Sequence, residues 1–122
     1  MLPPIFAVCA AETAVTAALG AAPTRLYPFG EAPQGVALPY AVWRVIPGGG
    51  PANFLGDRPD VDRFTLQVDV YATTGSAASA VTVALRDAIE PHAYITRWGD
   101  QDTDPDTGHR HIGFDVSWHV QR

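Results

Sequence analysis

Two segments of strict alternation between apolar and polar residues constrain the fold of this chain more than any other feature. In the first, apolar side chains stand at every second position: Phe64, Leu66, Val68 and Val70. In the second they stand at Ile112, Phe114, Val116, Trp118 and Val120. Successive side chains of a strand point to opposite faces, so each segment predicts a strand with one buried face and one wetter face. A sheet of this kind needs a second layer on its apolar face.

Two segments with helical periodicity supply that layer. Apolar residues near the start follow the spacing of one helix face, at Leu2, Ile5, Phe6 and Cys9, and Val15 and Leu19 continue it. Whether residues 2–19 form one helix or two stays open. The second helix is predicted to begin at an N-cap on Ser76 and to end before Pro91. Its apolar stripe is Val81, Ala84, Leu85 and Ala88, and its opposite side is Ser79, Thr82, Arg86 and Glu90.

The remaining strands are shorter or lie beside long connections. They are predicted at Arg25–Phe29, Tyr40–Ile46 and Ala93–Trp98. A Pro- and Gly-rich loop is predicted from Pro47 to Pro59, and the tip of a long hairpin from Gly99 to Gly108. The order of elements predicts an α+β fold, with helices packed on one face of a mostly antiparallel sheet of four to five strands with a long hairpin. We expect a single domain over residues 1–122.

Composition excludes several function classes. The chain has 122 residues, with 13 acidic side chains against 8 basic ones, and every basic residue is arginine. A net charge of −5 argues against a protein that grips nucleic acid, since such proteins cluster Lys and Arg against phosphates. No apolar run reaches the roughly 18–20 residues that span a bilayer, so we expect no membrane partner. The start lacks the basic region of a signal peptide, and the single cysteine, Cys9, excludes an internal disulfide.

The predicted loop 47–59 is a candidate interface. Its three glycines precede Pro51 rather than a helix, which argues against a phosphate-binding loop. Apolar residues on a long loop are typical of protein–protein contacts, although they also fold back onto a domain's own core. The candidate interface residues are Pro47, Gly48, Gly49, Gly50, Phe54, Leu55 and Arg58.

Seven of the thirteen acidic residues lie in two segments: Asp57, Asp60 and Asp62, and Asp100, Asp102, Asp104 and Asp106. The second series opens like a calcium loop, but Pro105 stands where that loop needs glycine and His111 where it needs a bidentate Glu. We therefore interpret it as a solvated hairpin tip.

A metal site is an alternative from a different class. His109, His111 and His119 are predicted on one strand face, with Asp115 beside them, and paired histidines bind zinc or copper. No further ligand has convincing spacing, and no nucleophile, elbow motif or paired acid points to catalysis. From the residues we expect no enzyme.

The order of segments resembles a known family. The resemblance covers nearly the whole chain, including the opening helix with its ETAVTAALG run. It is carried by residues 25–46, 57–89 and 111–120, and within them by Pro39-Tyr40 and by the QVDVYA strand, Gln67–Ala72. This pattern resembles the tail completion, or tail terminator, proteins of siphophages and prophages, formerly described as a domain of unknown function.

The resemblance implies a structural virion protein at the head–tail junction, assembled in the host cytoplasm. It implies a homo-oligomeric ring, with six subunits, that caps the tail tube and joins it to the head connector, and through which DNA passes. It implies no enzyme activity and no cofactor. An acidic lumen repels phosphate, so we expect one of the two acidic segments to face the channel or a ring face. The alternatives are a head-closure or minor tail component, the metal protein, and a bacterial binding module with no phage link.

Overall fold

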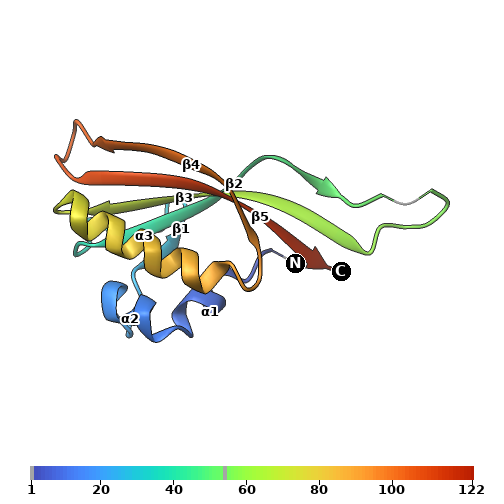
Figure 1. Cartoon of the computed structure of the whole chain (residues 1–122), viewed down its shortest axis with the longest axis horizontal. Helices are drawn as coiled ribbons and strands as arrows, with labels where there is room; N and C mark the ends of the chain where they lie inside the picture. Colours follow the sequence, from blue (N-terminus) through green and yellow to red (C-terminus); the bar gives the residue numbers. More distant parts are fainter. Residues whose placement is uncertain (1, 54) are drawn as a thin grey trace.

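The computed structural model describes residues 2–53 and 55–122, and its core is a five-stranded sheet covered by helices on one face (Figure 1). The helices are α1 (Ile5–Ala10), α2 (Thr13–Leu19) and α3 (Gly75–Ile89). The strands are β1 (Leu26–Pro28), β2 (Tyr40–Pro51), β3 (Val61–Ala72), β4 (Tyr94–Thr103) and β5 (Arg110–Gln121). The predicted α+β class, with helices on one face of the sheet, is confirmed. None of the described helices has the length and apolarity needed to cross a membrane.

The sheet has the strand order β1-β2-β3-β5-β4. All its pairs are antiparallel except β1 with β2, which run parallel over three residues. Strands β3 and β5 pair along their full length, from Val61 opposite Gln121 to Ala72 opposite Arg110. The predicted long hairpin is therefore present as β4–β5, and β2–β3 forms a second one.

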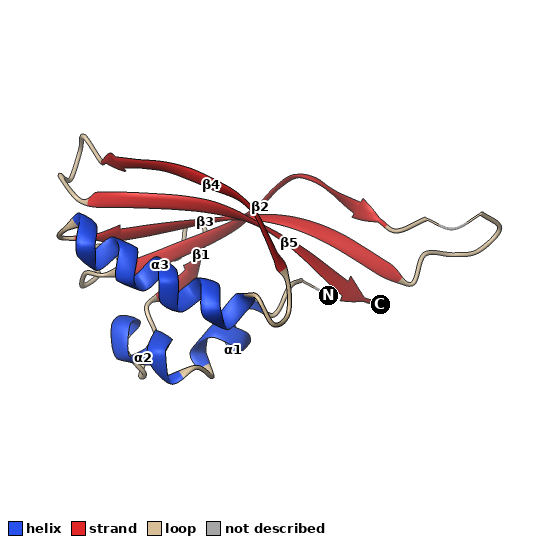
Figure 2. Cartoon of the chain, viewed as in Figure 1, coloured by secondary structure: helices blue, strands red, loops and turns tan. Residues whose placement is uncertain are grey.

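Both alternating segments behave as predicted. The side chains of Leu66, Val68 and Val70 in β3 and of Phe114 and Val116 in β5 are fully buried against the helices. Phe64 and Val120, at the ends of the two series, are only partly buried but still pack against this core. Figure 2 shows all three helices on one side of the sheet, leaving the opposite face open.

The N-terminal segment forms two helices, which settles the question left open by the sequence. Helix α1 ends at Ala10, and Glu12 has extended backbone angles that separate it from α2. Of the predicted apolar series, Ile5, Cys9, Val15 and Leu19 join the core across the break, whereas Leu2 and Phe6 are exposed. Burial and the nearby Glu12 raise the pKa of the Cys9 thiol to about 12, so it acts as a small core residue.

Helix α3 differs from the prediction in two places. Its N-cap is Thr74, whose side-chain oxygen accepts a hydrogen bond from the Ala77 amide at 3.1 Å, so the predicted cap at Ser76 was wrong. Thr82, predicted on the outer side, is buried. Its hydroxyl is satisfied within the helix by donating to the Ala78 carbonyl at 2.8 Å, which allows the methyl group to pack inward.

Two predicted loops are partly strand. Strand β2 runs past Ile46 to Pro51, so the loop predicted from Pro47 to Pro59 was wrong over its first five residues. Strand β4 runs to Thr103, so the hairpin turn is confined to residues 104–109 rather than 99–108. In both cases pairing with a neighbouring strand overrides local sequence, which is rich in Gly, Pro or Asp.

Candidate functional site: the arm and the open face of the sheet

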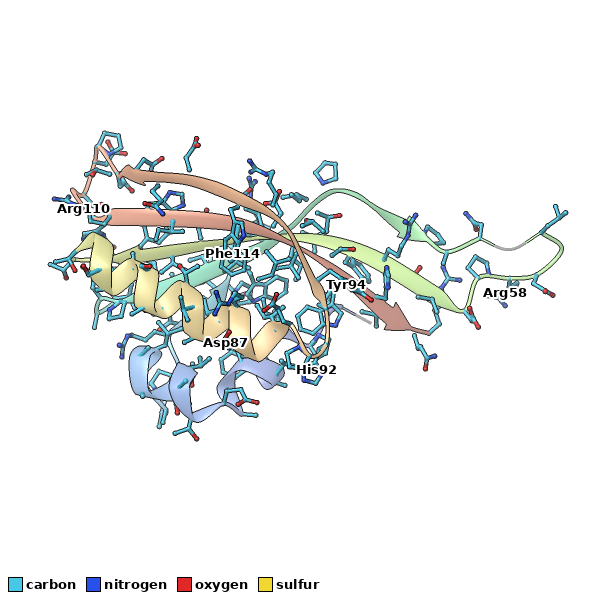
Figure 3. All side chains as sticks on the ribbon, in the orientation of Figure 1. Arg58, Asp87, His92, Tyr94, Arg110 and Phe114 are labelled. Carbon is cyan, nitrogen blue, oxygen red and sulfur yellow. The ribbon has the colours of Figure 1, made fainter. Side chains whose placement is uncertain are left out.

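The distal end of the β2–β3 hairpin projects past the helices as an arm, which we define as residues 47–62 (Figure 1). Its tip, residues 52–60, connects the two strands. The predicted interface residues all belong to this arm. Phe54 lies outside the described residues. Figure 3 places Arg58 at this far end of the molecule and Arg110 at the opposite end.

The three glycines form the β-bulge at the base of the arm. Pairing shifts between Ile46, opposite Thr65, and Gly50, opposite Arg63, so three residues of β2 face one residue of β3. A Cβ on Gly49 would overlap the Arg63 carbonyl oxygen, and one on Gly48 would lie 3.2 Å from the Thr65 hydroxyl. Gly48 also has a φ of +127°, which other residues rarely adopt. The glycines are thus needed to bring the two backbones together.

The bulge opens a groove with a volume of about 390 Å³. Its walls are largely apolar and come from Val45, Ile46, Pro47 and Phe64, together with the glycine backbone. Asp62, Arg63 and Arg122 also line it. The long Pro- and Gly-rich segment was the one feature of the sequence that pointed to this groove. Its walls could not be predicted, because Val45 and Phe64 come together only when β2 pairs with β3.

The tip carries both charge and an exposed apolar side chain. Leu55 is the most exposed large hydrophobic residue in the described part of the chain. Asp57, Arg58 and Asp60 follow it, and none of them forms a salt bridge within the described residues. A fully exposed leucine beside unpaired charges is typical of a segment that contacts another molecule.

Asp62 is set apart from the other arm carboxylates because it binds the C-terminal arginine. Both Asp62 oxygens accept hydrogen bonds from the Arg122 guanidinium, at 2.9 and 3.0 Å, in a bidentate pair. This hydrogen bonding lowers the pKa of the Asp62 carboxyl. Arg122 also donates to the Pro59 carbonyl, so the pair fastens the base of the tip to the end of β5.

The second acidic segment lies at the opposite end of the sheet. Thr103 pairs with Arg110, which in turn pairs with Ala72, whereas the arm includes Val61 and Asp62 at the other end of β3. At 3.3 Å per residue along β3 the two acidic segments are separated by roughly 35 Å. Asp100 and Asp102 are in β4, and Asp104 accepts the Asp106 amide within the turn. The sequence grouped these residues correctly but placed all four in a loop.

The open face of the sheet carries a polar network that crosses four strands. From β2 to β4 it runs through Arg44, Gln67, Asp69, His111 and Asp102, with Arg44 donating to Gln67 at 2.6 Å. The His111 ring lies between two carboxylates, with Nε2 2.7 Å from Asp69 and Nδ1 2.9 Å from Asp102. A second pair on this face joins Arg97 to the largely buried Asp115 at 2.9 Å.

Two carboxylates on one imidazole favour its doubly protonated form, in which both nitrogens donate. Partial burial lowers the pKa of His111, but hydrogen bonds and charge from Asp69 and Asp102 outweigh it, and the net pKa is raised. Tyr71 packs against the ring with centroids 5.1 Å apart, and Tyr40 stacks on Tyr71 at the same distance. The pKa of Tyr71 is raised to about 12, chiefly by burial and next by the nearby negative charge of Asp69.

The histidines do not form the metal set considered from the sequence. His111 and His119 share the open face but pair eight residues apart along β3, and His109 precedes β5. His111 already binds two carboxylates, and His119 meets the edge of Tyr94 with centroids 6.2 Å apart. Within residues 2–53 and 55–122 no group of three or more His, Cys, Asp or Glu side chains is arranged to hold a metal ion.

Comparison with known proteins identifies the family. The family model described as "Tail completion protein gp17" matches residues 3–121. The chain belongs to the tail completion protein family. No curated protein sequence matches it. The predicted resemblance is confirmed, and the chain is a structural component of the tail region of a virion.

Two solved structures share the fold of this tail completion protein. One is a chain of the virion of a native gene transfer agent particle, with a TM-score of 0.66 at 16% identity. The alignment covers 97% of this chain and 92% of that one. The other is the gp17 protein of bacteriophage SPP1, with a TM-score of 0.56 at 11% identity, covering 97% and 86%. At these identities the similarity concerns the fold.

Proposed function

We propose that this tail completion protein forms a homo-oligomeric ring, with six subunits, that caps the tail tube and joins it to the head connector, leaving a lumen for DNA. The proposal rests on the projecting arm, taken together with membership of the tail completion protein family. An arm without helices beneath it, ending in an exposed Leu55 and unpaired charges, fits a protein whose interfaces form on assembly. Its partners are further copies of itself, the tail tube protein and the head-closure or connector protein.

The charge distribution suits passage of DNA rather than binding. The net charge is −5, and the segments at 57–62 and 100–106 hold seven carboxylates against a single arginine, Arg58, so each segment repels phosphates. We propose that one of these segments faces the channel or a ring face. A ring structure with both segments on its outer rim contradicts this part of the proposal.

The proposed role is structural throughout, without catalysis or a cofactor. The conspicuous polar groups are engaged with one another: His111 with two carboxylates, Asp115 with Arg97, and Asp62 with Arg122. These contacts fix strands against one another, which is a structural role.

The test is to delete the gene in a phage or prophage that produces particles and to examine the products by electron microscopy. Loss of a cap leaves the tube end free to grow, so we expect separate DNA-filled heads and tails of irregular length. Adding the purified protein to uncapped tubes should place a ring at one end. Tails of normal length in the deletion strain favour the head-closure alternative, and intact particles contradict both assignments.

A further inference from the structure

No side chain of the described residues fills the groove at the base of the arm, although its walls are apolar. Val45 is 46% exposed there, and the glycines leave the floor without side chains. Strand β1 pairs with β2 only at Ala41, Val42 and Trp43, so within the described residues the outer edge of β2 has no neighbouring strand beyond Trp43. A groove of about 390 Å³ is large enough to receive a leucine side chain and the chain on either side of it.

The tip of the arm has the complementary properties. Leu55 is exposed and needs an apolar site, and Asp57 and Asp60 stand close to it in the sequence. The groove rim carries Arg63 and Arg122; within the described residues Arg122 forms a salt bridge with Asp62 and Arg63 forms none. Because Arg58 also lies on the tip, the tip has one negative charge in excess. The rim has one positive charge in excess, so the two surfaces are complementary.

The tip cannot fill the groove of its own chain. Gly50 and Pro51 remain paired with Arg63 and Asp62, so the hairpin stays extended between the groove and the tip. Leu55 lies five residues beyond Gly50, which corresponds to roughly 16 Å along the strand. Reaching its own groove requires these pairs to break, whereas reaching that of another copy does not.

We propose that the arm tip of one copy inserts Leu55 into the groove of the next copy, with Asp57 and Asp60 beside the rim arginines. The inference rests on the proposed ring and names the contact that builds it. Tip and groove are different surfaces, so the contact is heterologous, and repeating it produces a closed ring when the rotation closes. Each copy then gives one tip and receives one.

Cysteine cross-linking tests the contact directly. Two variants carry different affinity tags: one has Leu55→Cys and the other has Val45→Cys. They are mixed and oxidised, once in solution and once on purified uncapped tail tubes. The native Cys9 is fully buried and stays out of exchange. We expect a disulfide between the two tagged chains. The control pair replaces Leu55→Cys with Phe29→Cys, an exposed apolar position outside the arm, and should give none.

A second variant measures the strength of the contact. Leu55→Ser should weaken self-association roughly ten- to hundredfold, as expected for losing one buried leucine, while Phe29→Ser should not. Thermal unfolding of both variants should match wild type, because neither side chain is in the core. Oligomers or capped tubes without the tip–groove disulfide overturn the inference and leave the ring intact. Absence of self-association both in solution and on tubes overturns the inference and the proposed ring together.

Discussion

His111 is the residue whose replacement tests the polar network most directly. We expect His111→Gln to lower the free energy of unfolding by about 2 kcal/mol at pH 6. The bond to Asp69 supplies most of this, since both side chains are less than one-fifth exposed and a charged hydrogen bond of that kind contributes about 1.5–2 kcal/mol. Asp102 is 57% exposed, so its bond contributes under about 1 kcal/mol, and glutamine retains part of the bonding.

This loss is measurable by thermal unfolding. An unfolding entropy near 2.1 cal/mol/K per residue over this chain length gives roughly 4 °C per kcal/mol, so Tm should fall by about 8 °C. The matched control is His119→Gln, on the same face of the same strand, whose ring meets Tyr94 and has no carboxylate partner in the described residues. Its Tm should change by a small fraction of that amount.

The pH dependence has a defined sign. The folded pKa of His111 is raised above the ordinary value of 6.5, so its stabilisation is complete below that pH and is lost as pH rises through the folded pKa. The Tm difference between wild type and His111→Gln should therefore be largest near pH 6 and shrink above pH 6.5. Equal Tm shifts in the two variants, or an unchanged pH profile in His111→Gln, refute the reasoning.

Three further predictions concern the bulge, the helix cap and the core. Gly49→Ala should displace the arm and broaden or shift the amide NMR signals of β2 and β3, because its Cβ meets the Arg63 carbonyl, whereas Gly75→Ala meets nothing and should leave them unchanged. Thr74→Ala should cost about 1 kcal/mol in urea unfolding, and Ser76→Ala should cost much less because the cap is at Thr74. Phe114→Ala, at the centre of the core in Figure 3, should cost about 3–5 kcal/mol in the same assay.

Period-two alternation was sufficient to predict the central strands and their buried faces. Leu66 and Phe114 are core residues because a strand with one apolar face must bury that face, and this depends on local sequence alone. The same logic failed at residues 47–51. Three consecutive glycines between prolines are typical of a loop, and only the register of β3 shows that pairing resumes at Gly50 after the bulge.

The polar network could not be predicted from local sequence either, because its members come from different strands. Asp69 and His111 are 42 residues apart, and Asp102 is on a third strand. Each was visible as a polar residue in a strand, yet their meeting depends on the order β3-β5-β4 and on two irregularities in β4. Alternation along the strand also predicted that the histidines share one face, which is correct for His111 and His119. Alternation within one strand does not show which carboxylates lie beside them on neighbouring strands.

The two acidic segments have different roles in the proposed assembly, because their carboxylates have different partners. Asp57 and Asp60 lie on the tip, whose one excess negative charge meets the one excess positive charge of a neighbouring groove rim in the proposed contact, and Asp62 is already paired with Arg122. At the other end Asp102 is bound to His111, and Asp100, Asp104 and Asp106 form no salt bridge in the described residues. In a ring built by tip–groove contacts, unneutralised negative charge therefore remains at the β4–β5 end. Of the two segments, that end is the one suited to repel the DNA backbone.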